Sequence, residues 1–161
     1  MKMRKLGSQG LLVSEMGLGC MGMDHGYGQS ADREAMTTLI HKAIELGCNL
    51  FDTAPIYGFE NEELLGNALK AHRKNVVIAT KFGVLDMALV DGQPVPVLDS
   101  SPASIREQLD GSLQRLQTDY IDLFYQHRVD PKVEPEVVAQ TMKELIAEGK
   151  IKYWGISNAP A

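Results

Sequence analysis

The sequence alternates between short apolar runs and longer segments with helical periodicity, and this alternation constrains the fold more than any other feature. Strands are expected at residues 16–20, 49–52, 76–81, 120–126 and 151–156. Helices are expected from Ser30 to Leu46 and from starts at Asn61, Ser101-Pro102 and Pro135. Strands that alternate with helices pair in parallel through right-handed crossovers. Such a chain forms either an open doubly wound sheet or a (β/α)8 barrel.

The spacing of the strands favours the barrel. A barrel of roughly 250 residues divides into eight strand–helix units, and the intervals between these strands fit that division. Two apolar segments, Met3–Leu6 and Leu11–Val13, flank a Gly- and Ser-containing turn and predict an N-terminal β-hairpin. The 161 residues hold about five strands and four helices. We therefore expect a single domain over residues 1–161, with an α/β fold of (β/α)8 TIM-barrel type that is incomplete.

Composition excludes several other classes of protein. The net charge of −5 argues against non-specific nucleic-acid binding, which depends on basic surface. No apolar run approaches the roughly 20 residues that cross a bilayer, and no apolar segment of a secretory signal follows the basic N-terminus. Cys20 and Cys48 lack the spacing of a metal site or a disulfide framework. These features predict a cytoplasmic protein with free thiols that binds neither nucleic acid nor membranes.

Polar side chains stand where four of the predicted strands end, and a tyrosine follows one of these ends in a tight turn. They are Asp52, Tyr57, Lys81, His127, Ser157 and Asn158. The carboxyl ends of parallel strands lie on one face of the sheet, where active sites collect. Each residue taken alone is more often an ordinary turn, core or solvated side chain. Their coincidence at four strand ends favours a shared site.

Side chains of these types suit the protonation of a carbonyl oxygen. A tyrosine is a weak acid at neutral pH, and an ammonium such as that of Lys81 favours the phenolate form of a neighbouring tyrosine. Asp52 can pair with this lysine and hold it in place. His127 can orient a substrate oxygen or share in proton transfer. The residues therefore indicate a site that protonates a carbonyl oxygen as a hydride arrives at the carbon.

The ordered motifs of the chain resemble the aldo-keto reductase family over essentially the entire sequence. The motifs are Leu6–Gly10, Leu18–Met23, Asp52-Thr53-Ala54 with Tyr57-Gly58, Ala79-Thr80-Lys81, Tyr120–Leu123 with Gln126-His127, and Gly149-Lys150-Ile151 with Gly155–Asn158. The resemblance implies a (β/α)8 barrel that binds extended NAD(P)H at its C-terminal rim without a Rossmann fold. It also implies the reduction of aldehydes or ketones to alcohols by hydride transfer, with a small-molecule carbonyl compound as substrate.

By the same resemblance, Tyr57 is the general acid, and Asp52, Lys81 and His127 complete a catalytic tetrad. The implied cofactor-binding residues are Gly22, Met23, Asp52, Ser157 and Asn158. Among these, Ser157 and Asn158 match the pair that holds the nicotinamide carboxamide. The expected cofactor is NADPH, NADH remains open, and no metal is expected.

The resemblance stops short of the family's later strands, which supply a stacking aromatic, the pyrophosphate loop and the basic groups for the 2′-phosphate of NADPH. Two functions therefore stay open. The chain is either a carbonyl reductase or a catalytically silent truncated barrel fragment that acts only as a folding or interaction unit. Because a partial barrel has unpaired outer strands and an apolar inner face, we expect self-association through its edges.

Three further features have a structural interpretation. Gly17 to Gly22 satisfies G-x-G-x-x-G, but no helix is expected at the third glycine, so close backbone packing explains the glycines better than a dinucleotide site. Asp122 lies within a predicted strand and is expected to be a paired, structural carboxylate. Residues 82–100 are expected to form a long loop at the active rim that shapes a substrate pocket.

Overall fold

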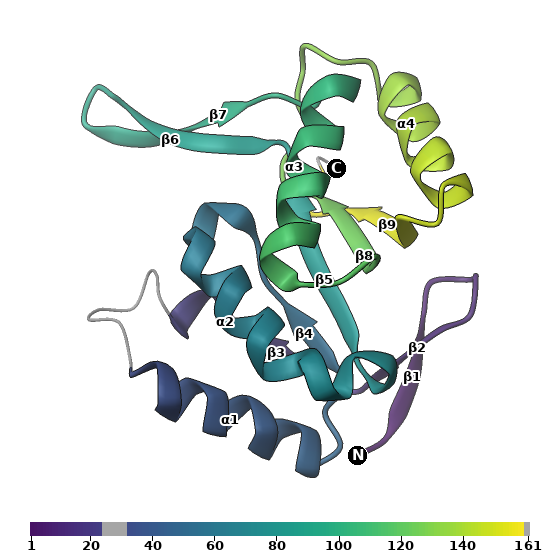
Figure 1. Ribbon diagram of the computed structural model, residues 1–161. Coiled ribbons are helices and arrows are strands. Elements are labelled where there is room, and N and C mark those ends of the chain that lie inside the picture. The colour runs from purple at the N-terminus through teal and green to yellow at the C-terminus, as the bar shows by residue number, and fades with distance from the viewer. Residues whose placement is uncertain (24–31, 160–161) are drawn as a thin grey trace.

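The computed structural model describes residues 1–23 and 32–159 and is built around a parallel sheet of five strands (Figure 1). These strands are β3 (Leu18–Gly19), β4 (Leu50–Asp52), β5 (Val77–Phe82), β8 (Ile121–Gln126) and β9 (Ile151–Ile156). They lie side by side in the order in which they occur in the chain. The register places Asp52 opposite Ala79 and Lys81 opposite Tyr125. The polar residues at the strand ends therefore reach the same edge of the sheet.

The helices cover one face of this sheet. They are α1 (Arg33–Glu45), α2 (Phe59–Leu69), α3 (Pro102–Leu116) and α4 (Pro135–Ala147). The described residues also form three short 3-10 helices, η1 (Met21–Met23), η2 (Pro55–Tyr57) and η3 (Lys70–Asn75). Buried residues of all four α-helices join residues of the strands in one hydrophobic cluster. A doubly wound sheet would carry helices on both faces, whereas a barrel wall carries them on its outer face only. The structure therefore confirms the barrel type rather than the open sheet.

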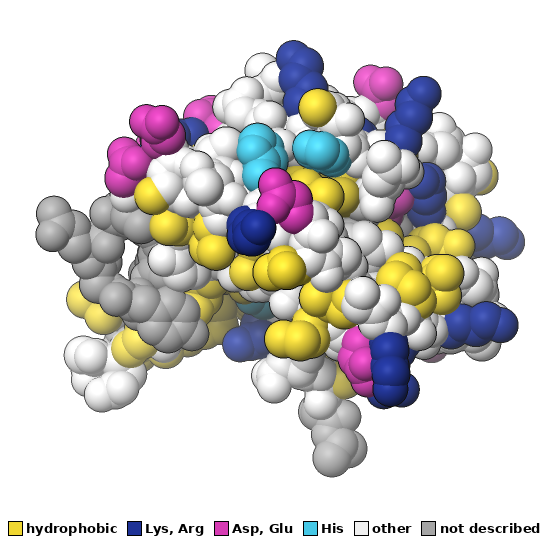
Figure 2. Space-filling model, turned by 90° about the horizontal axis from the view of Figure 1, so that it is seen from below, with side chains coloured by type: hydrophobic (Ala, Val, Ile, Leu, Met, Phe, Trp, Pro, Cys, Tyr) yellow, Lys and Arg dark blue, Asp and Glu magenta, His cyan; other side chains and the backbone are white. Residues whose placement is uncertain are grey.

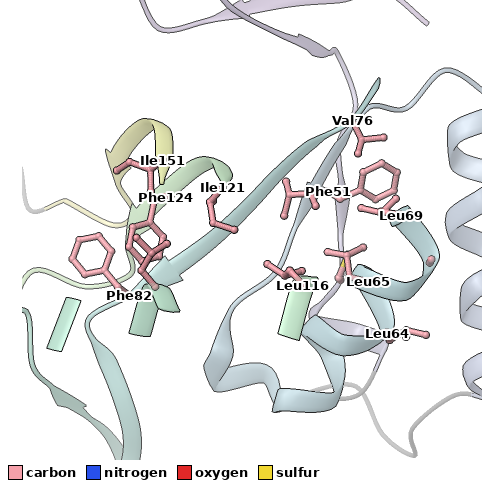
Figure 3. Packing of buried hydrophobic residues seen from close by; sticks show 14 of the residues in the cluster. Phe51, Leu64, Leu65, Leu69, Val76, Phe82, Leu116, Ile121, Phe124 and Ile151 are labelled. Atoms are coloured by element: carbon pink, nitrogen blue, oxygen red, sulfur yellow. The ribbon is translucent and has the colours of Figure 1, made fainter. Parts of the chain in front are cut away.

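Large apolar side chains fix the strands against the helices. Figure 3 shows Phe51 of β4 with Leu65 and Leu69 of α2. On neighbouring strands, the rings of Phe82 and Phe124 lie with their centroids 4.8 Å apart. Fully burying a side chain of this kind contributes about 1.5–3 kcal/mol. This layer therefore holds the strand ends, and the polar groups on them, at defined positions.

The other face of the sheet meets the N-terminal hairpin formed by β1 (Met3–Leu6) and β2 (Leu11–Ser14), as the sequence predicted. Leu11 and Val13 of β2 pack with residues of β5 and β8 in a second, smaller hydrophobic cluster. The hairpin is tied to the sheet by Asn49, whose Oδ1 accepts a hydrogen bond of 2.6 Å from the backbone N–H of Ser14. The hairpin thereby covers part of the barrel's inner face.

One predicted helix cap differs from the structure, and a second lies outside the described residues. Helix α2 begins at Phe59 after Gly58, so the prediction of Asn61 as its cap is wrong, and the Asn61 side chain bonds to Thr53 instead. Helix α1 has Asp32 as its N-cap, with the carboxylate accepting from the N–H of Ala35. The predicted cap of that helix, Ser30, lies outside the described residues.

The prediction of a long loop over residues 82–100 is wrong. The segment forms an antiparallel hairpin of β6 (Val84–Val90) and β7 (Gln93–Leu98) that projects from the body of the fold (Figure 1). Its turn, Asp91-Gly92, has positive φ at both residues, 50° and 75°. This is the conformation that Asp-Gly favours in tight hairpins. Among the described helices, none has the length and apolar character needed to cross a membrane.

Candidate active site

The structure brings four of the predicted site residues together at the carboxyl edge of the sheet. Asp52 is the last residue of β4, Lys81 lies near the end of β5, and His127 directly follows β8. Tyr57 comes from η2, in the connection between β4 and α2. Three neighbouring strands and one connecting loop therefore deliver the carboxylate, ammonium, imidazole and phenol to a common region.

The ammonium of Lys81 is the centre of the group. Its Nζ donates hydrogen bonds to Asp52 Oδ1 at 2.5 Å, to the backbone carbonyl of Thr53 at 2.9 Å and to the Tyr57 hydroxyl at 3.3 Å. An ammonium has three donors, so these partners satisfy it completely. The Lys81 side chain is only 8% exposed. A charge at this depth requires such partners, because an unpaired ion would lose its hydration without compensation.

Local backbone geometry directs the Tyr57 hydroxyl towards this ammonium. Pro55 fixes the first residue of η2, and Gly58 ends it with φ of 109°, a conformation that favours glycine. The Lys81 Nζ also lies 5.1 Å from the centre of the Tyr57 ring. The phenol is thus held by a short, constrained turn next to a positive charge.

The imidazole of His127 lies edge-on to Tyr57, with ring centroids 6.0 Å apart and planes at 89°. Burial lowers the pKa of His127 from 6.5 to about 4, and the positive charges of Lys81 and Arg128 act in the same direction. The ring is therefore neutral at physiological pH. A neutral imidazole can donate a hydrogen bond through one nitrogen and accept through the other.

A cavity of about 380 Å³ opens beside the phenol and the imidazole. Its lining residues are Met21, Ile56, Tyr57, Val84, Met87, Pro94, Pro96, His127 and Arg128. The projecting β6–β7 hairpin supplies an apolar wall through Met87, Pro94 and Pro96. The segment predicted to shape a pocket does line one, although as a hairpin and not as a loop.

The predicted cofactor-binding residues occupy different environments. Ser157 and Asn158 follow β9, where the N–H of Ser157 donates to the carbonyl of Gln126 and extends the strand pairing. Asn158 is exposed and has a φ of 56°. Gly22 is exposed within η1, whereas the Met23 side chain is buried in the main hydrophobic cluster. A ligand contact by Met23 would therefore involve its backbone.

Several buried polar residues that support this site carry no clear signal in the sequence. Thr53 and Asn61 are buried and hydrogen-bonded to each other, and Glu62 is buried with Thr80 and Arg115 as partners. Consecutive polar residues in the first turn of α2, next to the apolar Leu64 and Leu65, were the only signal available. Burial of Asn61 and Glu62 depends on tertiary packing, which a single sequence does not display.

Most of the residues given a structural interpretation behave as predicted, but close packing does not explain Gly19, where a Cβ atom would meet nothing within 4 Å. Asp122 pairs with Arg73 at 2.7 Å and with Lys152 at 3.0 Å, far along the strand from the site. A Cβ atom at Gly17 would lie 3.0 Å from the Leu50 side chain, so this glycine serves close packing. Cys20 and Cys48 are both buried and unpaired, as the spacing indicated. Within residues 1–23 and 32–159, no group of three or more metal-ligating side chains comes together.

Comparisons with known proteins agree with these observations. The model of the aldo/keto reductase family matches residues 15–161. The protein named "Probable aldo-keto reductase 1" from Glycine max is 42% identical over 157 residues, which cover 96% of this chain and 44% of that protein.

Solved structures show the same relationship. An aldo-keto reductase from Bacillus halodurans, in its holo form, matches with a TM-score of 0.84 and 38% identity, over 98% of this chain and 50% of the other. A thermostable aldo-keto reductase in complex with the inhibitor epalrestat matches with a TM-score of 0.81 and 30% identity, over 99% of this chain and 54% of the other.

The chain spans about half the length of the relatives that it matches. Its five parallel strands, with the helices on one face, form an incomplete (β/α)8 barrel, as the sequence predicted. The family match, the sequence identity and the shared fold lead to one conclusion: the chain belongs to the aldo-keto reductase family, whose members are oxidoreductases.

Proposed function

We propose that this chain carries the proton-transfer site of a carbonyl reductase that converts aldehydes or ketones to alcohols with NADPH. The observation that supports the proposal best is the chain of contacts from Asp52 through Lys81 to the Tyr57 hydroxyl. It ends at a cavity that Tyr57 and His127 share. In this proposal the small-molecule carbonyl compound binds in that cavity, with its apolar part against the β6–β7 hairpin.

Tyr57 acts as the general acid and gives its hydroxyl proton to the carbonyl oxygen of the substrate. This transfer leaves a phenolate 3.3 Å from the Lys81 ammonium. At an effective dielectric constant near 20, such a pair attracts by roughly 5 kcal/mol. The ammonium therefore lowers the energy of the state in which the proton has moved. Asp52 holds the lysine in this position, although its negative charge offsets part of the attraction between the ammonium and the phenolate.

His127 orients the substrate in this proposal. Because its pKa lies near 4, the imidazole is uncharged at neutral pH and can donate a hydrogen bond to the carbonyl oxygen without adding a second cation beside Lys81. Its position at the edge of the Tyr57 ring supports a shared role at one oxygen atom.

The residues at the rim fit the nicotinamide end of the proposed cofactor. Ser157 and Asn158 bring a hydroxyl and an amide to the end of β9, next to the strand that leads to His127. These groups can pair with a carboxamide, and Gly22, the Met23 backbone and Asp52 are the further proposed contacts. When bound, NADPH supplies the hydride for the carbonyl carbon, and NADH is the alternative to be compared with it.

The test is reduction of a simple aromatic aldehyde, followed by the loss of NADPH or NADH absorbance. We expect Tyr57→Phe to abolish activity, because phenylalanine keeps the ring and removes the acid. The control is Tyr120→Phe, which makes the same change where a tyrosine ring stacks with Arg73 and Lys152. Activity that persists in Tyr57→Phe would show that another group is the acid.

We also propose that the chain associates with itself, as the edge strands favour. β3 and β9 lie at the two edges of the sheet, where unpaired backbone groups promote pairing with another chain. Large apolar side chains also reach the surface, and Figure 2 shows apolar groups on the side seen from below. We expect light scattering to detect dimers or larger species. A monodisperse monomer that unfolds cooperatively would contradict this proposal, and an associated chain without reductase activity would favour the interaction unit.

A further inference from the structure

The loop that presents Tyr57 is closed at its base by a buried hydrogen bond. The hydroxyl of Thr53, directly after β4, donates to Oδ1 of Asn61 in the first turn of α2, at 2.7 Å. Thr53 is 0% exposed and Asn61 is 1% exposed. Tyr57 lies midway between them in the sequence. This bond therefore joins the two ends of the segment whose centre carries the phenol.

The other half of the Asn61 amide ties the loop to the sheet. Its Nδ2 donates to the backbone carbonyl of Cys20 at 2.8 Å, just beyond β3. The N–H of Cys20 in turn donates to the carbonyl of Asp52 at 2.8 Å, and the N–H of Thr53 donates to the carbonyl of Ala79. One side chain of α2 thus links the ends of two neighbouring strands.

Thr53 also binds Lys81, whose ammonium contacts the Tyr57 hydroxyl. Its carbonyl oxygen accepts the 2.9 Å hydrogen bond from Lys81 Nζ. The next residue of α2, Glu62, accepts a hydrogen bond of 2.7 Å from Thr80, the neighbour of Lys81 in β5. A displacement of Thr53 would therefore move both the base of the Tyr57 loop and a ligand of the ammonium.

From these contacts we propose that Thr53 and Asn61 are a positioning pair, which sets the Tyr57 hydroxyl against the Lys81 ammonium. The pair acts through Tyr57 and Lys81 and does not touch the reacting atoms. Its effect on catalysis rests on the function proposed above, whereas its effect on the position of Tyr57 does not depend on any activity.

The variants separate the hydrogen bond from the volume of the side chain. Thr53→Val keeps the shape of threonine and removes the donor to Asn61, and Thr53→Ser keeps the hydroxyl. Asn61→Ala removes the partner from the other side and serves as the second variant if Thr53→Val does not fold. The matched control is Thr141→Val, because Thr141 is 3% exposed and its hydroxyl donates at 2.9 Å to Val137 within α4.

The first measurement is NMR of the protein with 13C-labelled tyrosine rings, in which Tyr57→Phe identifies the Tyr57 resonance among the five tyrosines. We expect this resonance to shift and broaden in Thr53→Val and in Asn61→Ala. The Tyr57 resonance should return to its wild-type position in Thr53→Ser and should be unchanged in Thr141→Val. An unchanged Tyr57 resonance in folded Thr53→Val or Asn61→Ala would overturn the proposal.

The second measurement is steady-state kinetics with the aldehyde. A misplaced acid lowers kcat on the order of ten- to a hundredfold, and we expect KM to change far less. Thr53→Ser should recover most of kcat, and Thr141→Val should keep it. Equal kcat in Thr53→Val and wild type would contradict the catalytic role of the pair. Absence of activity in the wild-type chain would instead count against the proposed function, and the NMR result would still decide the positioning.

Discussion

The ammonium of Lys81 and the carboxylate of Asp52 lie 2.5 Å apart at the ends of two adjacent strands. The lysine side chain is 8% exposed and the aspartate 36%, so the pair stands at the boundary between the protein interior and solvent. The carboxylate reaches water, while the ammonium depends on protein partners. This asymmetry places the positive charge next to Tyr57 and leaves the negative charge in contact with solvent.

Removing the ammonium should therefore impair proton transfer more than it impairs folding. We expect Lys81→Met to reduce kcat by about 10²–10⁴-fold, the range in which acid–base groups contribute. The measurement is the aldehyde-reduction assay. Lys152→Met is the control, because Lys152 also pairs with an aspartate, Asp122, and is half exposed. A comparable loss in both variants would mean that kcat reports general damage and not the Lys81 charge.

The stability of the protein should depend on pH through His127. Its pKa is about 4 in the folded state, against an ordinary value of 6.5. Between these pH values the unfolded chain binds a proton that the folded chain does not, so unfolding becomes easier as the pH falls. The contribution of the neutral His127 side chain to the free energy of unfolding is fully present above pH 6.5. It is lost progressively as the pH falls from 6.5 to about 4.

Substituting His127 by glutamine should remove this dependence. The free energy of unfolding is measured by denaturant titration at a series of pH values in the wild type and in His127→Gln. The acidic residues titrate in both proteins, so the difference between the two curves isolates the histidine. We expect the free energy of unfolding of the wild type to rise relative to that of His127→Gln as the pH rises from about 4 to 6.5. A difference that is constant across that window would contradict the lowered pKa of His127.

The regular elements and the strand-end residues could be predicted because their signals are local. Val76 to Lys81 is an apolar run that suits a buried strand, and Ser101-Pro102 is a strong helix start, so the order of strands and helices follows. Parallel pairing then places Asp52, Lys81 and His127 on one edge without further information. The three residues indeed meet at that edge.

Asn61 and the hairpin were mispredicted for different physical reasons. Asn61 is a preferred cap residue, but the hydroxyl of Thr53 and the carbonyl of Cys20 offer it partners that only the folded chain brings near. In the hairpin, Pro94 and Pro96 indicated a loop. A two-stranded ribbon tolerates proline because both of its strands are edges. The Asp91-Gly92 turn was the local signal that outweighed them.

The buried carboxylate of Glu62 should be a major determinant of stability. It is 0% exposed, lies 2.7 Å from Arg115 Nε and accepts a hydrogen bond from Thr80. Glu62→Ala leaves the guanidinium without its partner, and breaking a buried pair of this kind costs about 3–5 kcal/mol. Denaturant unfolding measures the loss. Glu45→Ala is the control, since its pair with Lys42 is exposed and should matter little. Equal stability of the two variants would contradict this role of Glu62.

Both thiols should be inert in the folded protein. Cys20 is fully buried, and burial followed by the charge of Asp52 raises its pKa to about 12, while Cys48 is buried and also unpaired. The thiolate is the reactive form, so neither cysteine should react with an aromatic disulfide reagent under native conditions. We expect both thiols to react once guanidinium unfolds the chain. Rapid labelling of either thiol in the folded protein would show that this region opens.

The packing of α2 against α3 should depend on Gly66. A Cβ atom there would lie 2.7 Å from the backbone of Leu116, which cannot move aside as a side chain can. Alanine is intrinsically better than glycine in a helix by about 1 kcal/mol. Overpacking of this kind nevertheless costs about 1–3 kcal/mol, so we expect Gly66→Ala to be destabilising. Because α2 carries Asn61 and Glu62, a displaced α2 should also lower kcat.

Gly111→Ala is the matched control, since Gly111 is likewise a glycine within a helix, α3. A Cβ atom there would meet Nη1 of Arg115 at 2.8 Å, at the far end of a flexible side chain, which can shift while Nε keeps its ion pair with Glu62. We expect Gly111→Ala to change the free energy of unfolding by less than about 1 kcal/mol, near the helix-propensity gain. Both values come from denaturant titration. If Gly66→Ala proves as stable as Gly111→Ala, then α2 and α3 can separate without loss, and the first turn of α2 is not held by this contact.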